Sequence, residues 1–139
     1  MTLVLDGSAA LALLLPDERE APAARTIRAE FNRANRVLAP LHWFAEVANG
    51  IVVAERRKRI FPTEADKLLT ALRRLGVAGD VVPPEDAVAA ACLLARQHGL
   101  TAYDAAYLEL ALRENAVLAT QDNALRRAAN ASAVPLVPA

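Results

Sequence analysis

Four carboxylates that are far apart in the sequence stand where they could act together. Asp6 directly follows an apolar segment of strand length, and Asp122 follows another that ends near Thr120. Glu46 and Asp104 lie in segments of helical periodicity, and Glu46 has apolar residues beside it on its helix. No lysine or arginine is adjacent in sequence to any of the four, so each lacks a local counter-charge.

Carboxylates that converge raise one another's pKa and oppose folding unless a cation lies between them. Hard divalent ions such as Mg²⁺ and Mn²⁺ prefer oxygen ligands and match this need. Such an ion can orient or deprotonate a water and offset the negative charge on a phosphorane. The pattern therefore predicts metal-assisted hydrolysis of a phosphodiester, with Asp6, Glu46, Asp104 and Asp122 as the metal-binding and catalytic residues.

Each carboxylate taken alone also has a structural explanation. Asp6 and Asp122 could simply cap helices, because Asp is favoured at a helix N-cap. The spacing Thr101-x-x-Asp104 is that of a capping box. Glu46 could form an ion pair with an arginine. Only the four together favour a shared acidic site.

The segments that must position these residues alternate between strand and helix patterns. We expect strands at residues 2–5, 36–39, 81–82, 116–120 and 136–137, and helices at 8–15, 19–32, 40–58, 63–75, 85–98, 101–114 and 123–129. Ser8, Thr63 and Thr101 are the expected N-caps, and Gly76 and Gly99 should follow helix ends.

This alternation predicts an α/β fold, in which a short parallel sheet carries helices on both faces. In such sheets the functional crevice lies beyond the carboxyl ends of the strands. Asp6 and Asp122 should therefore meet at one edge of the sheet.

Composition limits the class of protein. With 139 residues, 55% of them hydrophobic, the chain suits one domain spanning residues 1–139. Sixteen Lys and Arg balance sixteen Asp and Glu, so bulk charge gives no attraction to nucleic acid. A single cysteine excludes an internal disulfide, and together with two histidines it is too little for a self-contained zinc site.

Asp6 interrupts the apolar N-terminal run, so we expect no signal peptide, no membrane helix and a cytoplasmic protein.

Four segments together resemble a PIN domain, and more narrowly a VapC-type toxin of a bacterial toxin–antitoxin pair. They are Leu-Val-Leu-Asp-Gly-Ser at 3–8, the helix bearing Glu46, Ala-Tyr-Asp-Ala-Ala-Tyr at 102–107 and Leu-Ala-Thr-Gln-Asp at 118–122. The resemblance covers essentially the whole chain. It implies that Asp6 and Asp104 are the primary metal ligands, that Glu46 and Asp122 complete the acidic pocket, and that Ser8 and Thr120 support the carboxylates by hydrogen bonds.

Two positions qualify that resemblance. Gly7 stands where relatives often have Thr or Ser. Glu55 is an alternative to Glu46, but it lies in a charged stretch and we prefer Glu46.

The resemblance implies a Mg²⁺-dependent endoribonuclease, with Mn²⁺ as a possible substitute. It also implies an RNA substrate, a cognate VapB-like antitoxin and a homodimer within the toxin–antitoxin complex. Three alternatives stay open: a PIN-like module that only binds, a haloacid-dehalogenase-type phosphatase and a response-regulator receiver. The phosphatase needs a second Asp where this chain has Ser8, and the receiver needs a late lysine, although none follows Lys67.

Some other residues have both a structural and a functional interpretation, and others have a structural interpretation alone. The basic run at 56–59 is either a solvated helix end or a phosphate-steering patch, and Arg113, Arg126 and Arg127 are equally open. We expect His42 and His98 to be structural and Cys92 to be an inert core residue. Tyr103 and Tyr107 should serve in packing or at an interface. For the antitoxin, the expected apolar groove comprises Leu11, Leu14, Leu15, Trp43 and Phe44.

Overall fold

A parallel sheet runs through the middle of the protein. The structure, a computed structural model, describes residues 1–81 and 83–139. Within them the strands are β1 (Thr2–Leu5), β2 (Arg36–Pro40), β3 (Ala78–Asp80), β4 (Val117–Ala119) and β5 (Leu136–Val137). Their order is β3-β2-β1-β4-β5, and every neighbouring pair is parallel. The chain moves outward from β1 in one direction and returns on its other side, so the order reverses between β1 and β4.

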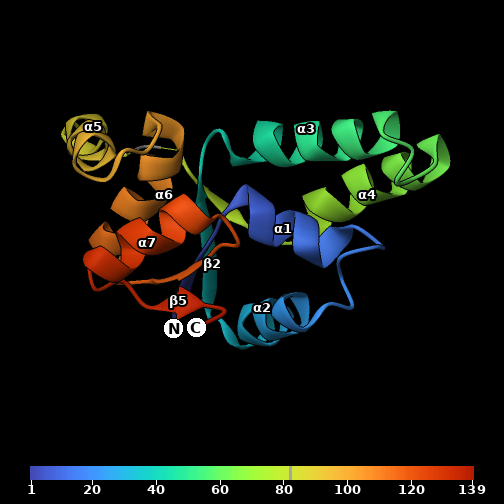
Figure 1. Ribbon diagram of the computed structural model, residues 1–139, viewed down its shortest axis with the longest axis horizontal. Coiled ribbons are helices and arrows are strands. Elements are labelled where there is room, and N and C mark those ends of the chain that lie inside the picture. The colour runs from blue at the N-terminus through green and yellow to red at the C-terminus, as the bar shows by residue number, and fades with distance from the viewer. Residues whose placement is uncertain (82) are drawn as a thin grey trace.

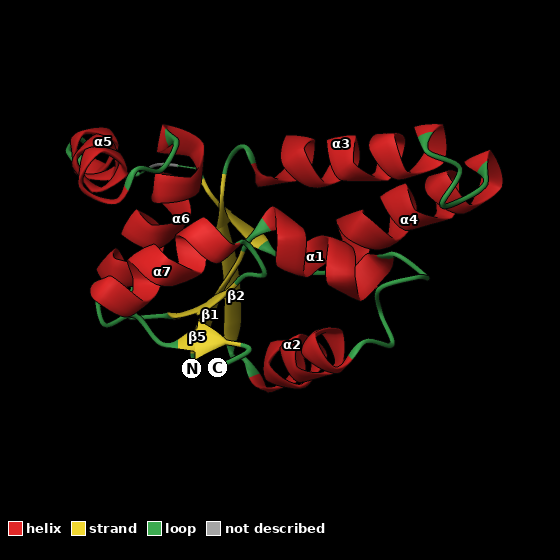
Figure 2. Ribbon diagram, viewed as in Figure 1, coloured by secondary structure: helices red, strands yellow, loops and turns green. Residues whose placement is uncertain are grey.

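Helices cover both faces of this sheet. They are α1 (Gly7–Leu14), α2 (Pro22–Arg33), α3 (Trp43–Arg56), α4 (Pro62–Arg74), α5 (Ala87–His98), α6 (Ala102–Arg113) and α7 (Asn123–Ala131). Figure 1 shows α1 and α2 on one side of the strands and α6 and α7 on the other. The α3–α4 pair extends from the α1 side, and α5 packs against α6 (Figure 2). The predicted α/β architecture with helices on both faces is confirmed.

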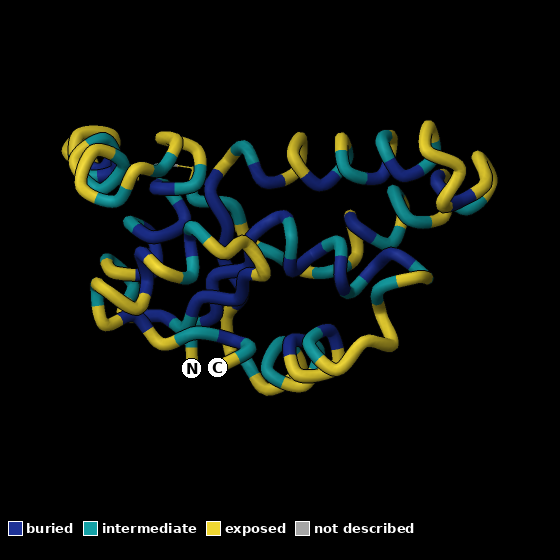
Figure 3. The backbone as a smooth tube through the Cα atoms, in the orientation of Figure 1, coloured by how far each residue is buried: buried dark blue, intermediate teal, exposed yellow. Residues whose placement is uncertain are grey.

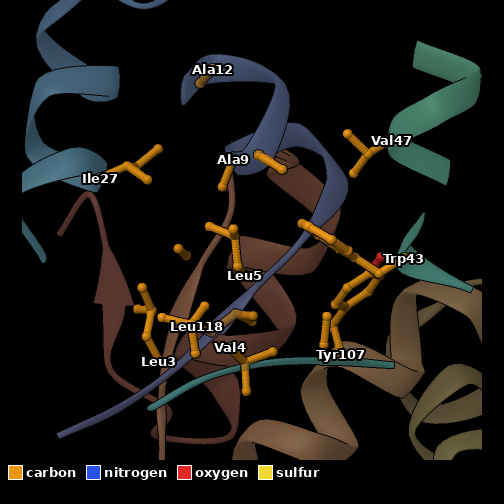
Figure 4. Packing of buried hydrophobic residues seen from close by; sticks show 14 of the residues in the cluster. Leu3, Val4, Leu5, Ala9, Ala12, Ile27, Trp43, Val47, Tyr107 and Leu118 are labelled. Carbon is orange, nitrogen blue, oxygen red and sulfur yellow. The ribbon is translucent and has the colours of Figure 1, made fainter. Parts of the chain in front are cut away.

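The core forms around β1, the middle strand. Leu3, Val4 and Leu5 are completely buried, as expected for a strand covered on both faces. The buried stretches in Figure 3 follow the strands and the inward sides of the helices. Figure 4 shows Leu5 directed toward Ala9 of α1 within this core. Across the part of the chain that the structure describes, no helix has the length and hydropathy needed to cross a bilayer.

The first strand-to-helix turn differs from the prediction. Asp6, and not Ser8, is the N-cap of α1, because its side chain accepts a hydrogen bond from the backbone N–H of Ala9. The helix therefore begins at Gly7, with only Asp6 between it and the strand.

The predicted strand at 81–82 is also wrong in its position along the chain. The strand beside β2 is Ala78–Asp80, Val81 lies after it, and Val82 lies outside the described residues. Ala, Gly and Asp are poor strand formers, so pairing with β2 overrides their local preference.

Other helix boundaries shift for local reasons. The second helix begins at Pro22 and not at 19, and α5 begins at Ala87 and not at 85. The third begins at Trp43 because Pro40 is still part of β2. Phe61 replaces Thr63 as the N-cap of α4, where the Glu64 carboxylate accepts from the Phe61 N–H at 3.0 Å.

The capping prediction at α6 is confirmed. Thr101 is its N-cap, and the threonine hydroxyl accepts from the Asp104 N–H at 3.1 Å. Gly76 and Gly99 follow α4 and α5 with φ of 73° and 66°, in the left-handed region that glycine tolerates.

Most of the residues that we expected to form a groove for the antitoxin are not at the surface. Leu14, Leu15 and Trp43 are buried, because α1 lies among α2, α3 and α4. Leu11 packs against the core, and only Phe44 is exposed. Cys92 also departs from the prediction: it is half-buried on α5, which packs chiefly on α6, and so it lies outside the core.

Candidate active site

Asp6 is held at the end of the middle strand by three hydrogen bonds. Its Oδ1 accepts from the Ala9 N–H at 2.8 Å and from the Ser8 hydroxyl at 2.7 Å, and its Oδ2 accepts from the Thr120 hydroxyl. The residue is only 4% exposed. The turn from β1 into α1 therefore fixes the carboxylate in one orientation.

The two hydroxyls tie this turn to the equivalent turn after β4. The Ser8 Oγ accepts from the Gln121 N–H at 2.8 Å, and the Thr120 Oγ1 accepts from the Asp122 N–H at 3.0 Å. A hydroxyl that accepts from a backbone N–H keeps its one proton for another acceptor, here Asp6. The sequence prediction assigned Ser8 and Thr120 to supporting hydrogen bonds, and the structure places both in contact with Asp6.

The environment of Asp6 disfavours its charged form. Burial raises the pKa of the Asp6 carboxyl to about 6, against the lowering effect of its three hydrogen bonds, and the nearby negative charge of Glu46 adds to the rise. Asp6 and Glu46 are therefore close enough to repel each other.

Glu46 reaches Asp6 from the first turn of α3. Its Oε2 accepts a hydrogen bond from the Tyr107 hydroxyl at 2.9 Å and lies 3.7 Å from His42 Nε2. The side chain is 40% exposed, so solvent reaches this part of the site. Glu55, the alternative, lies about 2.5 turns further along α3, and the geometry supports the choice of Glu46.

Asp104 and Asp122 form the other part of the site. Asp122 is the N-cap of α7, where its Oδ1 accepts from the Leu125 N–H at 2.8 Å. Asp104 lies in the first turn of α6. Partial burial raises the pKa of Asp104, and the charge of Asp122 raises it further, against the lowering effects of Thr101 and His42.

Tyr107 connects these two pairs of carboxylates. Burial raises the pKa of its phenol, and so do the charges of Glu46, Asp6 and Asp104. Among residues 1–81 and 83–139, no three His, Cys, Asp or Glu side chains lie close enough to enclose an ion on their own. We refer to Asp6, Glu46, Asp104 and Asp122 as the acidic site, which consists of two neighbouring pairs.

The donor set of the acidic site fits Mg²⁺ or Mn²⁺. It offers carboxylate oxygens, and in the described part of the chain no lysine or arginine forms an ion pair with any of the four. Mg²⁺ keeps several waters and commonly binds through one or two carboxylates, so a closed protein cage is not required.

Sequence reasoning missed two residues at this site. Tyr107 was expected only in packing or at an interface, but its buried phenol also bonds Glu46. His42 was expected to be structural, yet its ring contacts those of Tyr103 and Tyr107 edge-on and lies beside Glu46. The i,i+4 spacing of His42 and Glu46 and the i,i+3 spacing of Asp104 and Tyr107 were the available signals.

Three of the ambiguous arginines have structural partners. Arg126 donates to the backbone carbonyls of Thr120 at 2.9 Å and Pro138 at 2.8 Å. Arg113 pairs with Asp80 and Glu109. Arg59, in the basic run, pairs with Asp17 and Glu18, whereas the rest of that run is solvent-facing.

The chain matches known proteins along nearly its full length. Ribonuclease VapC3 of Pyrobaculum aerophilum is 35% identical over 125 residues, which are 90% of this chain and 92% of that protein. The crystal structure of PAE2754 from the same organism has a TM-score of 0.70 at 25% identity, covering 99% of this chain and 85% of that one. VapBC2 from Rickettsia felis, bound to a DNA fragment from their promoter, has a TM-score of 0.65 at 17% identity, covering 98% and 97%, and shows likeness of fold.

These similarities agree with the resemblance found in the motifs. Residues 3–131 match the PIN domain family, so the match includes all of β1 except Thr2, the acidic site and all of α7. The haloacid-dehalogenase alternative has no support, because Ser8 stands at the required second Asp and its hydroxyl is engaged with Asp6 and Gln121. The chain belongs to the PIN domain family.

Proposed function

We propose that this protein is a VapC-type toxin, an endoribonuclease that hydrolyses RNA phosphodiester bonds with Mg²⁺ or Mn²⁺ at the acidic site. The observation that carries the proposal is Asp6. A buried carboxylate with a raised pKa, next to a second carboxylate and without a cationic side chain, is costly unless a cation binds there. The 35% identity to a protein named Ribonuclease VapC3 supports the same activity.

Each residue of the acidic site has a role that follows from its position. Asp6 and Asp104 would hold the ion, and Glu46 and Asp122 would complete its surroundings directly or through water. Ser8 and Thr120 keep Asp6 in one orientation through their hydrogen bonds. When bound, the ion supplies water activation and neutralises the charge that develops on the phosphoryl group. In the overall reaction a water oxygen bonds to phosphorus and one P–O ester bond breaks.

The negative charge of the acidic site repels RNA when no metal is bound. The same negative charge would attract a cationic side chain of an inhibiting partner. An antitoxin arginine or lysine placed among the carboxylates would pair with them and exclude the metal. The VapBC2 likeness supports a VapB-like antitoxin as that partner. A homodimer of this chain within the complex is part of the same proposal. A cytoplasmic location is part of this proposal, since the proposed RNA substrate is found there.

Cleavage of RNA tests the nuclease. The wild-type chain should cleave RNA in Mg²⁺ or Mn²⁺ and lose that activity in EDTA. Asp104→Asn should be inactive in both conditions, whereas Asp66→Asn, an exposed carboxylate on α4, should behave as wild type. Cleavage that persists in EDTA, or in Asp104→Asn, would refute the metal-dependent mechanism.

The toxin–antitoxin assignment needs a separate experiment. The chain should co-purify with the small protein encoded beside it, and RNA cleavage should appear only after that protein is removed by proteolysis. Full activity of the intact complex would contradict inhibition while leaving the nuclease assignment in place.

A further inference from the structure

Glu46 occupies space that a side chain at position 7 would fill. A Cβ added to Gly7 would lie 2.8 Å from Glu46 Cδ and 3.0 Å from Glu46 Cγ. The first of these separations is shorter than real Cβ contacts show, so the Glu46 side chain would have to shift if position 7 carried a Cβ. Gly7 is the first residue of α1 and directly follows Asp6. The missing side chain therefore opens the approach of Glu46 to Asp6.

The opposite side of Glu46 is held by a rigid group. Tyr107 is completely buried, and its hydroxyl donates to Glu46 Oε2 at 2.9 Å. A buried tyrosine cannot follow a carboxylate that moves away. Glu46 thus lies between Gly7, whose missing side chain leaves room for it, and a fixed donor on α6.

We propose that Gly7 is a positioning residue: its missing side chain lets the Glu46 carboxylate reach both Tyr107 and the neighbourhood of Asp6. This inference rests on the proposed function, in which Glu46 helps to surround the metal. It assigns the glycine a role at the site that helix formation does not require.

The backbone at Gly7 does not need a glycine. Its φ is outside the positive region, unlike those of Gly76 and Gly99. Alanine is a better helix former than glycine, and the atoms it would meet are the end of a flexible side chain. Gly7→Ala should therefore fold and move Glu46, which separates a positioning role from a structural one.

Mn²⁺ binding and crystal structures of variants test the proposal. In Gly7→Ala the 2.9 Å contact between Tyr107 and Glu46 should be lost, and the Kd for Mn²⁺ measured by calorimetry should rise about tenfold. Glu46→Ala should raise Kd to a similar extent. The Gly7→Ala/Glu46→Ala double variant should bind no more weakly than Glu46→Ala alone, because Gly7 acts through Glu46.

Gly50→Ala is the matched control. A Cβ there would crowd Leu11, at 2.9 Å from its Cδ2, and so disturb the α1–α3 interface one turn further along α3 than Glu46, without meeting Glu46 itself. It should lower the melting temperature and leave the Kd for Mn²⁺ within about twofold of wild type.

Two results would overturn the inference. One is a Gly7→Ala crystal structure in which Glu46 still bonds Tyr107, and the other is an unchanged Kd for Mn²⁺ in Gly7→Ala. A wild-type chain that neither binds Mn²⁺ nor cleaves RNA would instead refute the proposed function, and the Gly7→Ala crystal structure would then decide the position of Glu46 on its own.

Discussion

The acidic site has a half built by strand ends and a half carried on helices. Asp6 and Asp122 cap α1 and α7 and accept hydrogen bonds from the first-turn amides of those helices. Glu46 has one hydroxyl donor, from a residue 61 positions away in sequence. The strand-end carboxylates therefore serve both fold and site, whereas the helix-borne ones depend on how α3 and α6 pack. Substitutions in the two halves should have different effects on stability.

The largest expected effect is on catalysis. Asp104→Asn should lower kcat/KM for RNA cleavage by on the order of 10³-fold, because it removes a proposed metal ligand. Its free energy of unfolding in EDTA should not fall, since α6 keeps its Thr101 cap. Kinetics and urea denaturation of the same preparation check both points, and a loss of activity that follows a loss of folding would contradict the division between the two halves.

The second effect is on the pH dependence of folding stability, which Asp6 should cause. Its folded pKa of about 6 lies above the ordinary 3.8, so the folded state binds the proton more tightly than the unfolded state. This contribution to stability is complete below about pH 4 and is lost as pH rises through 6, by about 2–3 kcal/mol.

Urea denaturation in EDTA from pH 4 to pH 7 measures this loss. Asp6→Asn should show a flatter profile than wild type, and Mn²⁺ should restore wild-type stability above pH 6. Identical slopes for wild type and Asp6→Asn would show that Asp6 titrates normally.

A smaller effect is expected at the second strand end. Asp122→Ala should lower the free energy of unfolding in EDTA by about 1 kcal/mol, because the Leu125 N–H loses its cap. Asp66→Ala, on an exposed helix surface, should stay within about 0.5 kcal/mol of wild type. If the two variants unfold at the same urea concentration, the cap of α7 contributes nothing measurable.

The smallest effect tests repulsion between the two halves, at Asp104 and Asp122. Asp104→Asn should raise the metal-free melting temperature by about 2 °C, since burial and the charge of Asp122 both disfavour the Asp104 carboxylate. In Mn²⁺ the order should reverse, because wild type gains stability from the bound ion. A variant that melts lower than wild type in EDTA would show that Asp104 is not under electrostatic strain.

Sequence reasoning worked where the controlling interactions are local. Asp6 directly follows a strand, Thr101 directly precedes a helix, and Thr120 and Asp122 come just after another strand. Their order along the chain was therefore enough to place them. The parallel sheet then brings Asp6 and Thr120 together, although they are 114 residues apart.

Prediction from the sequence failed where packing between distant elements determines the structure. Nothing local in Ala78–Asp80 favours a strand, and the pairing with β2 comes from elsewhere in the chain. The apolar side chains of Leu14 and Leu15 resemble a docking surface until α2 and α4 cover them. The contact between Tyr107 and Glu46 requires the relative placement of α3 and α6, which neither helix encodes alone.

A crystal of the wild-type chain soaked in Mn²⁺ tests the central claim most directly, because anomalous scattering locates the ion. We expect one ion, bonded to Asp6 from the strand-end half and to Asp104 or Glu46 from the helix-borne half. A peak that contacts only one half, or no peak at Asp6, would contradict a shared acidic metal site.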